Sequence, residues 1–246
     1  MRFAFQWLRS LLFVFQIYLM MPIFGLAFAP WAIFSKRGAR LCCKSYSRWV
    51  FWTARLMVGI RCEVRGTPPQ GEVLIAAKHQ SFLDIMMIFT ALPTAKFIMK
   101  KEILRTPVIG QYAKLLDCVA VDRGKRGAAI DKMVQDVKTG HQEAGQLIIY
   151  SQGTRVAPGV KADYKIGTGV LYEQLGQTCV PVATNVGVLW PRTGIMRKPG
   201  VAVVEFLDPI EAGMDRKEFM AVLEERVEAK SDALMRELGF DPDAVS

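Results

Sequence analysis

A long stretch without a charged side chain, residues 11–34, most constrains what this chain of 246 residues can fold into. Only Gln16 and Tyr18 interrupt its apolar side chains with polar groups. About 20 apolar residues are enough for a helix to cross a bilayer, so this segment is predicted to be embedded in a membrane. Pro22 and Pro30 each remove a helical hydrogen bond, so a kinked or re-entrant pair of helices is an alternative to one simple crossing.

The residues that follow this stretch are basic and do not resemble the end of a cleaved signal peptide, which has a short polar region with a small-residue cleavage site. Glu63 is the one acidic residue in a block of Lys and Arg interspersed with Trp and Phe between 36 and 65. Such a block suits an anionic membrane surface on the cytoplasmic side. The alternative is a solvated basic helix packed on the rest of the protein. We assign residues 1–65 to membrane-anchoring helices and 66–246 to an α/β domain.

The net charge of +9 belongs mainly to this block. A basic protein can bind nucleic acid, but no nucleic-acid motif accompanies the charge, so anionic lipid or a phosphorylated substrate explains it better. The chain has five cysteines, without the spacing of metal ligands, and they are interpreted as reduced thiols. We therefore expect no nucleic-acid partner and no metal site.

Beyond a turn-rich segment at 66–71, short apolar runs alternate with helical patterns. Strands are predicted at 73–77, 96–99, 118–121, 146–150, 179–184 and 201–207. Helices are predicted at 82–91, 108–116, 127–138, 166–175 and 215–237. Such alternation predicts an α/β fold, with a mixed, largely parallel sheet flanked by helices and an N-terminal membrane-embedded helical segment.

His79 lies two residues after the end of the first predicted strand, 73–77. Histidine is the side chain whose unperturbed pKa lets it act as a base near neutral pH, and a nearby carboxylate can fix its tautomer. Asp84 follows five positions later, and on one continuous helix the two side chains would point apart. They meet only if His79 lies before the helix and folds back over its first turn, with Ser81 as the N-cap. The alternative is a turn in which Asp84 only caps the helix.

Arginine and glycine recur in the loops after later strands, where ligands of open α/β sheets gather. Arg123 follows the strand at 118–121, and Arg155 follows the strand at 146–150. Each guanidinium can bind a phosphate through paired hydrogen bonds, while neighbouring glycines allow close backbone approach. Together they predict a phosphate pocket; the alternative is two unrelated surface arginines.

Taken in order, four blocks within about residues 72–190 resemble the membrane-bound glycerolipid acyltransferase family, especially the 1-acyl-sn-glycerol-3-phosphate acyltransferases. The blocks are His79 with Asp84; Lys100-Lys101-Glu102 through Pro107 and Gly110 to Asp122-Arg123-Gly124; Gln152-Gly153-Thr154-Arg155; and Val180-Pro181-Val182. Two positions depart from the family pattern. Lys78 stands where the family usually has asparagine, and Gln152 where it usually has glutamate. Glutamine retains one acceptor oxygen but loses the charge and gains donors, so the departure bears on the acceptor more than on the chemistry.

The resemblance implies acyl transfer from a thioester of coenzyme A or acyl carrier protein to the sn-2 hydroxyl of 1-acyl-glycerol 3-phosphate, giving phosphatidic acid. His79 would be the general base and Asp84 its orienting partner, with no acyl-enzyme and Ser81 as a cap only. The phosphate-binding candidates are Arg123, Gly124, Gln152, Gly153, Thr154 and Arg155, and Lys100, Lys101 and Pro181 are possible supporting residues. The apolar residues 85–89 would line an acyl groove or form a buried core helix.

The expected partners are a lysophospholipid acceptor, the acyl thioester and membrane lipids, with no cofactor beyond the thioester. The expected location is a membrane, specifically a bacterial inner membrane with the catalytic domain on its cytoplasmic side. Two alternatives remain open: an acyltransferase for another lyso-lipid acceptor, such as a lyso amino-acid lipid, and a membrane lipid-binding protein without catalysis.

Overall fold

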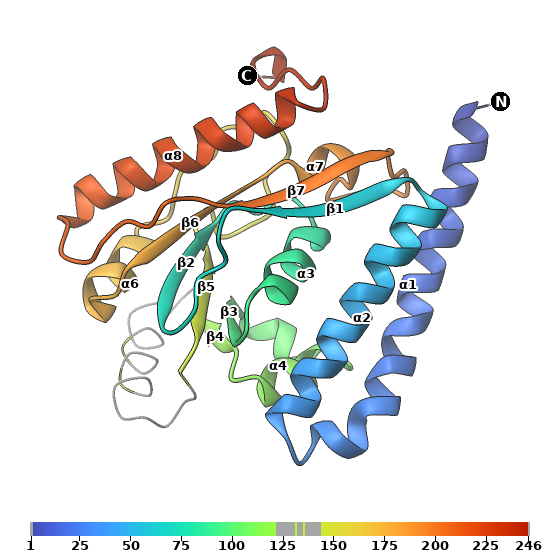
Figure 1. The fold of residues 1–246 in the computed structure, drawn as a ribbon, viewed down its shortest axis with the longest axis horizontal. Coiled ribbons are helices and arrows are strands. Elements are labelled where there is room, and N and C mark those ends of the chain that lie inside the picture. The colour runs from blue at the N-terminus through green and yellow to red at the C-terminus, as the bar shows by residue number, and fades with distance from the viewer. Residues whose placement is uncertain (1, 122–130, 132–134, 136–143, 246) are drawn as a thin grey trace.

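The computed structural model describes residues 2–121, 131, 135 and 144–245. They form a sheet of seven strands in the order β1-β7-β6-β2-β5-β3-β4, flanked by helices (Figure 1). The strands are β1 (Ile60–Arg65), β2 (Val73–Ala77), β3 (Ala95–Lys100), β4 (Val119–Val121), β5 (Gln146–Tyr150), β6 (Cys179–Thr184) and β7 (Gly200–Phe206). Neighbouring strands pair in parallel except β6 and β7, which are antiparallel. The predicted mixed, largely parallel α/β sheet is confirmed.

The helices are α1 (Arg2–Ala32), α2 (Lys36–Met57), α3 (Phe82–Ala91), α4 (Ile109–Leu115), α6 (Gly167–Leu175), α7 (Val186–Leu189) and α8 (Arg216–Arg236), with 3-10 turns η1 (Lys101–Arg105) and η2 (Asp243–Val245). Apart from residues 131 and 135, the predicted helix at 127–138 lies outside the described residues. The other predicted helices match α3, α4, α6 and α8 to within one residue at each end.

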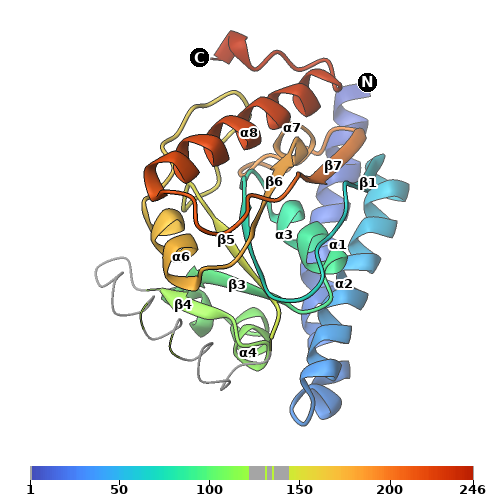
Figure 2. The same ribbon diagram turned by 60° about the vertical axis from the view of Figure 1, so that its left-hand side comes forward.

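The N-terminal segment forms two helices that pack side by side along one edge of the molecule (Figure 2). The first, α1, continues through Pro22 and Pro30, so the break between the helices falls after Ala32 and not at either proline. Gln16, a polar residue in the apolar run, bonds across to α2, where its Nε2 donates to Thr53 Oγ1 at 3.0 Å and its Oε1 accepts from Trp49 Nε1 at 2.9 Å. Its polar groups are thus satisfied within the helix pair.

Most of the apolar surface of α1 is exposed. Residues 3–32 form a helix long and apolar enough to cross a membrane, and only 17% of its most apolar window is buried inside the protein. Exposed side chains along it include Phe15 and Leu26, which are 65% and 73% accessible. Exposed apolar surface on this scale is typical of contact with lipid, so the chain is membrane-associated through α1.

The strand β1 was not predicted from the sequence, because its residues belong to the basic block that follows the apolar run. Arg61, Glu63 and Arg65 alternate in it with apolar residues, which is the pattern of an edge strand, and its described pairing is with β7. The predicted boundary at 65/66 therefore falls after a strand of the sheet, and the helical part of the segment ends at Met57.

Two hydrophobic clusters lie on opposite faces of the sheet, between the strands and the helices that flank them in Figure 1. Successive residues of a strand point to opposite faces. In β2, Ile75 and Ala77 belong to the cluster with α1, α2 and α3, whereas Leu74 and Ala76 belong to the cluster with α6 and α8. This alternation continues past the end of β2 and determines how the next two residues are placed.

Candidate active site

The residues at the carboxyl end of β2 extend toward opposite faces of the sheet. The side chain of Lys78 lies on the α8 side of the sheet, where its Nζ forms an ion pair with Glu228. His79 follows the α3 side, where its ring meets Asp84. The strand periodicity thus sends a cation to one face and the candidate base to the other.

The first turn of α3 holds the His79–Asp84 contact. Ser81 is the N-cap, and its Oγ accepts from the Leu83 amide at 3.3 Å. Asp84 completes a capping box, since its Oδ2 accepts from the amides of Gln80 at 2.8 Å and Ser81 at 2.7 Å. Its Oδ1 lies 2.8 Å from His79 Nδ1. The arrangement expected from the sequence, with histidine folded back over the first turn, is present. Asp84 both caps the helix and holds the imidazole.

Tyr150, the last residue of β5, completes the surroundings of this pair. Its ring stacks on the His79 ring with centroids 3.9 Å apart and planes at 18°, and its hydroxyl donates to Asp84 Oδ1 at 3.2 Å. Burial raises the pKa of Tyr150 well above its usual value, and the negative charge of Asp84 adds to the effect, so the hydroxyl stays protonated. Sequence reasoning missed this residue. The parallel pairing of Tyr150 with Ala77, two residues before His79, is what brings it to the site.

The buried carboxylate of Asp84 therefore accepts four hydrogen bonds, two from backbone amides and two from side chains. A carboxylate is the natural acceptor for the Nδ1 proton of a neutral imidazole, which assigns the tautomer with Nε2 unprotonated. Among the described residues Nε2 has no hydrogen-bond partner, and the side chain is 13% exposed. The arrangement presents an oriented, accessible proton acceptor.

The segment after β5 lies directly against His79. The Val156 amide donates to the His79 carbonyl at 2.8 Å, so the backbone that follows Arg155 lies against the backbone of the candidate base. Gly153 has φ +69°, a left-handed conformation that glycine adopts without steric cost. Thr154 is exposed. Arg192, which sequence reasoning did not single out, contacts the same loop, where its Nη1 donates to the Arg155 carbonyl at 3.3 Å.

The other candidates divide between three locations. Gln152 is 3% exposed, and its side chain bonds to the Ala162 carbonyl and to Glu228 of α8. Pro181 is buried within β6, in register with Ala76. Lys100 and Lys101 are exposed where β3 meets η1. Arg123 and Gly124 lie outside the described residues.

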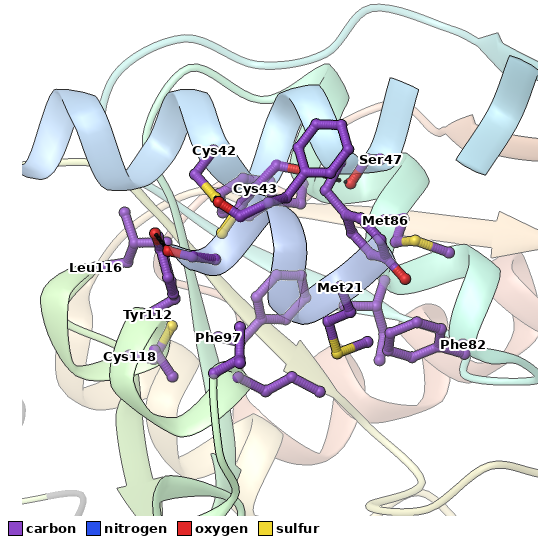
Figure 3. Close-up of a pocket in the computed structure, with 18 of the residues that line it drawn as sticks. Met21, Cys42, Cys43, Ser47, Phe82, Met86, Phe97, Tyr112, Leu116 and Cys118 are labelled. Carbon is purple, nitrogen blue, oxygen red and sulfur yellow. Dashed lines mark hydrogen bonds between the residues drawn. The ribbon is translucent and has the colours of Figure 1, made fainter. Parts of the chain in front are cut away.

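An apolar cavity of ≈ 170 Å³ lies between α1, α2, α3, β3 and α4 (Figure 3). Phe97 lines it and also stacks on Tyr150 at 6.0 Å between centroids, so a row of rings leads from His79 to the cavity wall. Met86 of α3 lines it as well, together with Phe82, Ile85 and Phe89. Part of the 85–89 segment thus lines an apolar cavity, and Met87 and Ile88 of the same segment are buried in the core.

The two tyrosine hydroxyls of the cavity wall are already hydrogen-bonded to backbone carbonyls. Tyr112 donates its hydroxyl to the Gly25 carbonyl at 2.8 Å, and Tyr46 donates to the Ile17 carbonyl at 2.8 Å. Burial raises the pKa of Cys118 to about 11, so this lining thiol is neutral. Gly25 permits close packing of α1 on α4, since a Cβ there would lie 2.6 Å from Val108. The cavity is therefore suited to an alkyl chain and unsuited to a charged ligand.

Within the described residues, no group of three or more His, Cys, Asp and Glu side chains is placed to hold a metal ion. The chemistry that the site displays is that of a carboxylate-oriented imidazole at the carboxyl end of a parallel sheet, beside an apolar cavity. An oriented imidazole of this kind is typical of general-base sites, and the carboxyl ends of parallel strands are where ligands of such sheets bind.

Comparison with known proteins identifies the family. The model of the acyltransferase family matches residues 60–185, and the chain belongs to this family. It is 27% identical over 201 residues to the 1-acyl-sn-glycerol-3-phosphate acyltransferase of Pseudomonas aeruginosa, covering 81% of this chain and 78% of that one. The protein of the same description from Saccharomyces cerevisiae is 26% identical over 203 residues, covering 80% of this chain and 67% of that one.

A solved structure supports the fold. The crystal structure of the 1-acyl-sn-glycerophosphate acyltransferase from Thermotoga maritima is similar over 95% of this chain and 99% of that one, with a TM-score of 0.79 and 19% identity. That coverage includes the α/β domain and most of the N-terminal helices. The protein is therefore an acyltransferase with an N-terminal apolar helix.

Proposed function

We propose that this acyltransferase transfers a fatty acyl group from a thioester to the sn-2 hydroxyl of 1-acyl-glycerol 3-phosphate, giving phosphatidic acid. The observation that carries the proposal is the contact between His79 Nδ1 and Asp84 Oδ1, which leaves Nε2 available to accept a proton. The names of the relatives in Pseudomonas aeruginosa and yeast support the choice of acceptor. The donor is a thioester of coenzyme A or acyl carrier protein, which is consumed as a co-substrate.

The proposed reaction has two proton movements. As the acceptor oxygen attacks the thioester carbonyl carbon, its proton moves to His79 Nε2, and Asp84 stabilises the resulting imidazolium. The carbon–sulfur bond then breaks, and the proton passes from Nε2 to the departing thiolate. No enzyme nucleophile takes part, because Ser81 is engaged as the cap of α3. General base catalysis of this kind supplies about 10²–10⁴-fold in rate.

The substrates occupy different parts of the site in this proposal. The apolar cavity beside Phe97 takes the acyl chain of the thioester, because it offers hydrocarbon contact and no unsatisfied polar group in its lining tyrosines. Arg155 holds the acceptor phosphate in this proposal, because the next residue, Val156, is hydrogen-bonded to the His79 carbonyl. A phosphate bound to Arg155 would bring the adjacent glycerol hydroxyl to the base. Arg123 is proposed as its partner from the resemblance of its block.

Membrane association follows from the substrates, since acceptor, acyl chain and product are all lipids. The exposed apolar surface of α1 gives the anchor, and the basic residues of α2 suit an anionic surface. We propose a bacterial inner membrane with the catalytic domain on its cytoplasmic side, the side that positive flanks prefer.

An acceptor screen with the purified full-length protein in detergent tests the function. Free thiol release and product mass would be followed with 1-acyl-glycerol 3-phosphate, glycerol 3-phosphate and a lyso amino-acid lipid. We expect phosphatidic acid from the first, and loss of thiol release in His79→Ala. Preference for the phosphate-free acceptor would contradict the proposed acceptor. If no thiol were released from the thioester with any of the acceptors, a lipid-binding role without catalysis would be favoured.

A further inference from the structure

On the face of the sheet opposite His79, one carboxylate of α8 accepts hydrogen bonds from three separate loop segments. Glu228 forms an ion pair with Lys78 through Oε2, and its Oε1 accepts from the Tyr164 hydroxyl at 3.0 Å and from Gln152 Nε2 at 3.4 Å. We call Lys78, Gln152, Tyr164 and Glu228 the Glu228 cluster. Lys78 precedes the candidate base, and Gln152 lies three residues before Arg155. The cluster therefore connects α8 to both segments that carry the proposed chemistry.

The cluster is closed to solvent on the sheet side. Lys78 is 2% exposed and Gln152 is 3% exposed. A buried ammonium is costly unless an opposite charge accompanies it, so Lys78 holds Glu228 in place as firmly as Glu228 holds Lys78. Burial raises the pKa of Tyr164, with a further contribution from the charge of Glu228, so its hydroxyl stays protonated and remains a donor.

Other carboxylates surround the same ammonium. Glu224 and Asp232 lie one turn before and one turn after Glu228 on α8. Burial raises the pKa of both groups, Glu228 raises it further, and Lys78 lowers it. An additional negative charge inside the cluster would therefore meet repulsion from three acids of one helix face.

We propose that Glu228 is a positioning residue. By bonding to both Lys78 and Gln152, it aligns the segment 152–156, which carries Arg155, with His79. The inference rests on the proposed function and deepens it. Its effect is carried by Gln152, whose Nε2 also donates to the Ala162 carbonyl at 3.2 Å and so fixes the start of the loop. Alignment of the acceptor, more than of the thioester, depends on this loop.

Lys78 and Gln152 both take part in this interaction with Glu228. A glutamate at position 152 would place a second carboxylate in the contact where Gln152 Nε2 and Glu228 Oε1 are 3.4 Å apart. The amide at 152 donates to Glu228 where a carboxylate would repel it. Lys78 supplies the positive charge that the buried end of Glu228 requires. In this chain the carboxylate comes from α8, and the Gly-Thr-Arg loop contributes the amide.

A reciprocal exchange tests the proposal. Gln152→Glu, Glu228→Gln and the double variant would be compared in the full-length protein, with Glu225→Gln, an exposed acid of the same helix, as the matched control. Acceptor KM, thioester KM, kcat and thermal unfolding would be measured for each. We expect each single variant to raise acceptor KM about tenfold with little change in thioester KM, as for loss of a charged hydrogen bond.

The double variant restores one carboxylate and one amide to the contact, so its acceptor KM should return to within about threefold of the parent. Multiplied defects in the double variant, or equal effects on both KM values, would overturn the proposal. Lower unfolding temperatures with unchanged KM values would do the same, since they indicate a structural ion pair only.

A further variant tests the Glu228 cluster independently of the exchange. Tyr164→Phe removes one donor without a change of charge and is expected to raise acceptor KM about threefold, so it tests the cluster even if Glu228→Gln does not fold. An unchanged acceptor KM in Tyr164→Phe would then count against the proposal. The acceptor used is whichever one the parent enzyme acylates in the screen, so a wrong acceptor assignment is separable from failure of the cluster.

Discussion

The two faces of the sheet differ sharply at the end of β2, although the residues that begin the difference are neighbours in sequence. On the face of α3, His79 lies among aromatic rings and meets one buried carboxylate that is fully hydrogen-bonded. On the face of α8, Lys78 meets Glu228, with Glu224 and Asp232 nearby. One face presents an oriented base beside an apolar cavity, and the other holds a concentration of charge.

The comparison shows why the charges lie behind the sheet. A carboxylate close to an imidazole favours its protonated form, and a general base must be neutral to accept a proton. Only Asp84 makes this contact among the described residues. The acids of α8 lie on the other face, where Glu228 bonds to Lys78 and Gln152.

The largest effect is expected from Asp84→Asn, which alters the charge on the His79 face with almost no change in shape. The asparagine oxygen can still accept from the amides of Gln80 and Ser81, but its NH₂ would then face Nδ1 and favour the tautomer protonated on Nε2. We expect kcat to fall about 10²–10⁴-fold. Thiol release assays measure the fall, and unchanged thermal unfolding would show that the helix cap survives. A fall below tenfold would mean that Asp84 serves mainly as a cap.

A smaller effect is expected from filling the cavity on the same face. Ala113→Phe adds a ring to its α4 wall and should lower kcat/KM for long-chain thioesters about tenfold, with a short-chain thioester less affected. Ala221→Phe, at an exposed position of α8, is the control for the added surface. Equal losses for short and long chains would argue that the acyl group lies elsewhere.

Tyr150→Phe removes one hydrogen bond to Asp84 and keeps the ring that stacks on His79. The carboxylate retains three donors, so kcat should fall only about threefold. Tyr150→Leu, which also removes the stack, should cost more, and the ratio of the two variants measures what the ring contributes. Equal activities of Tyr150→Phe and Tyr150→Leu would show that the stack is without consequence.

Much of the fold could be predicted because the inner strands are buried on both faces. The strands β2, β5 and β6 are short apolar runs bounded by turn or polar residues, and their predicted bounds agree with the structure. The edge strand β1 was missed because its alternating charges resemble a solvated segment. The alternative of a kinked or re-entrant pair of helices depended on Pro22 and Pro30, but α1 contains both prolines and its packing partner is α2, a contact that a local pattern does not contain.

The candidate site was predictable only where its geometry is local. The cap, His79 and Asp84 lie within six residues, so a turn that places His79 before the helix and Ser81 at its N-cap is enough to bring His79 and Asp84 into contact. Tyr150 enters through strand pairing, and Glu228 reaches Lys78 from 150 positions away in the chain. No spacing rule in the sequence indicates either of these contacts.

The smallest expected effect tests the charged face through stability. Folding raises the pKa of Glu224, chiefly through burial and then through the charges of Glu228 and Asp163, so its charged form is disfavoured in the folded protein. Below the unfolded-state pKa the group is protonated in both states, and Glu224→Gln should match the parent. As the pH rises through the folded-state pKa, the parent carries the penalty and the variant does not. The variant should therefore be the more stable near neutral pH.

Because Glu224 is exposed, water screens much of this repulsion, and the gain should not exceed about 0.5 kcal/mol. Thermal unfolding of the full-length protein at about pH 4 and about pH 7.5 measures it on either side of the transition. Glu225→Gln, next to it in the chain and exposed, controls for loss of an acid from the same helix. A gain that is equal at both pH values, or a loss at neutral pH, would mean that Lys78 already compensates the whole acidic face. The two faces of the sheet would then differ in where their charged groups lie, but repulsion between the acids of α8 would not lower the stability of the protein.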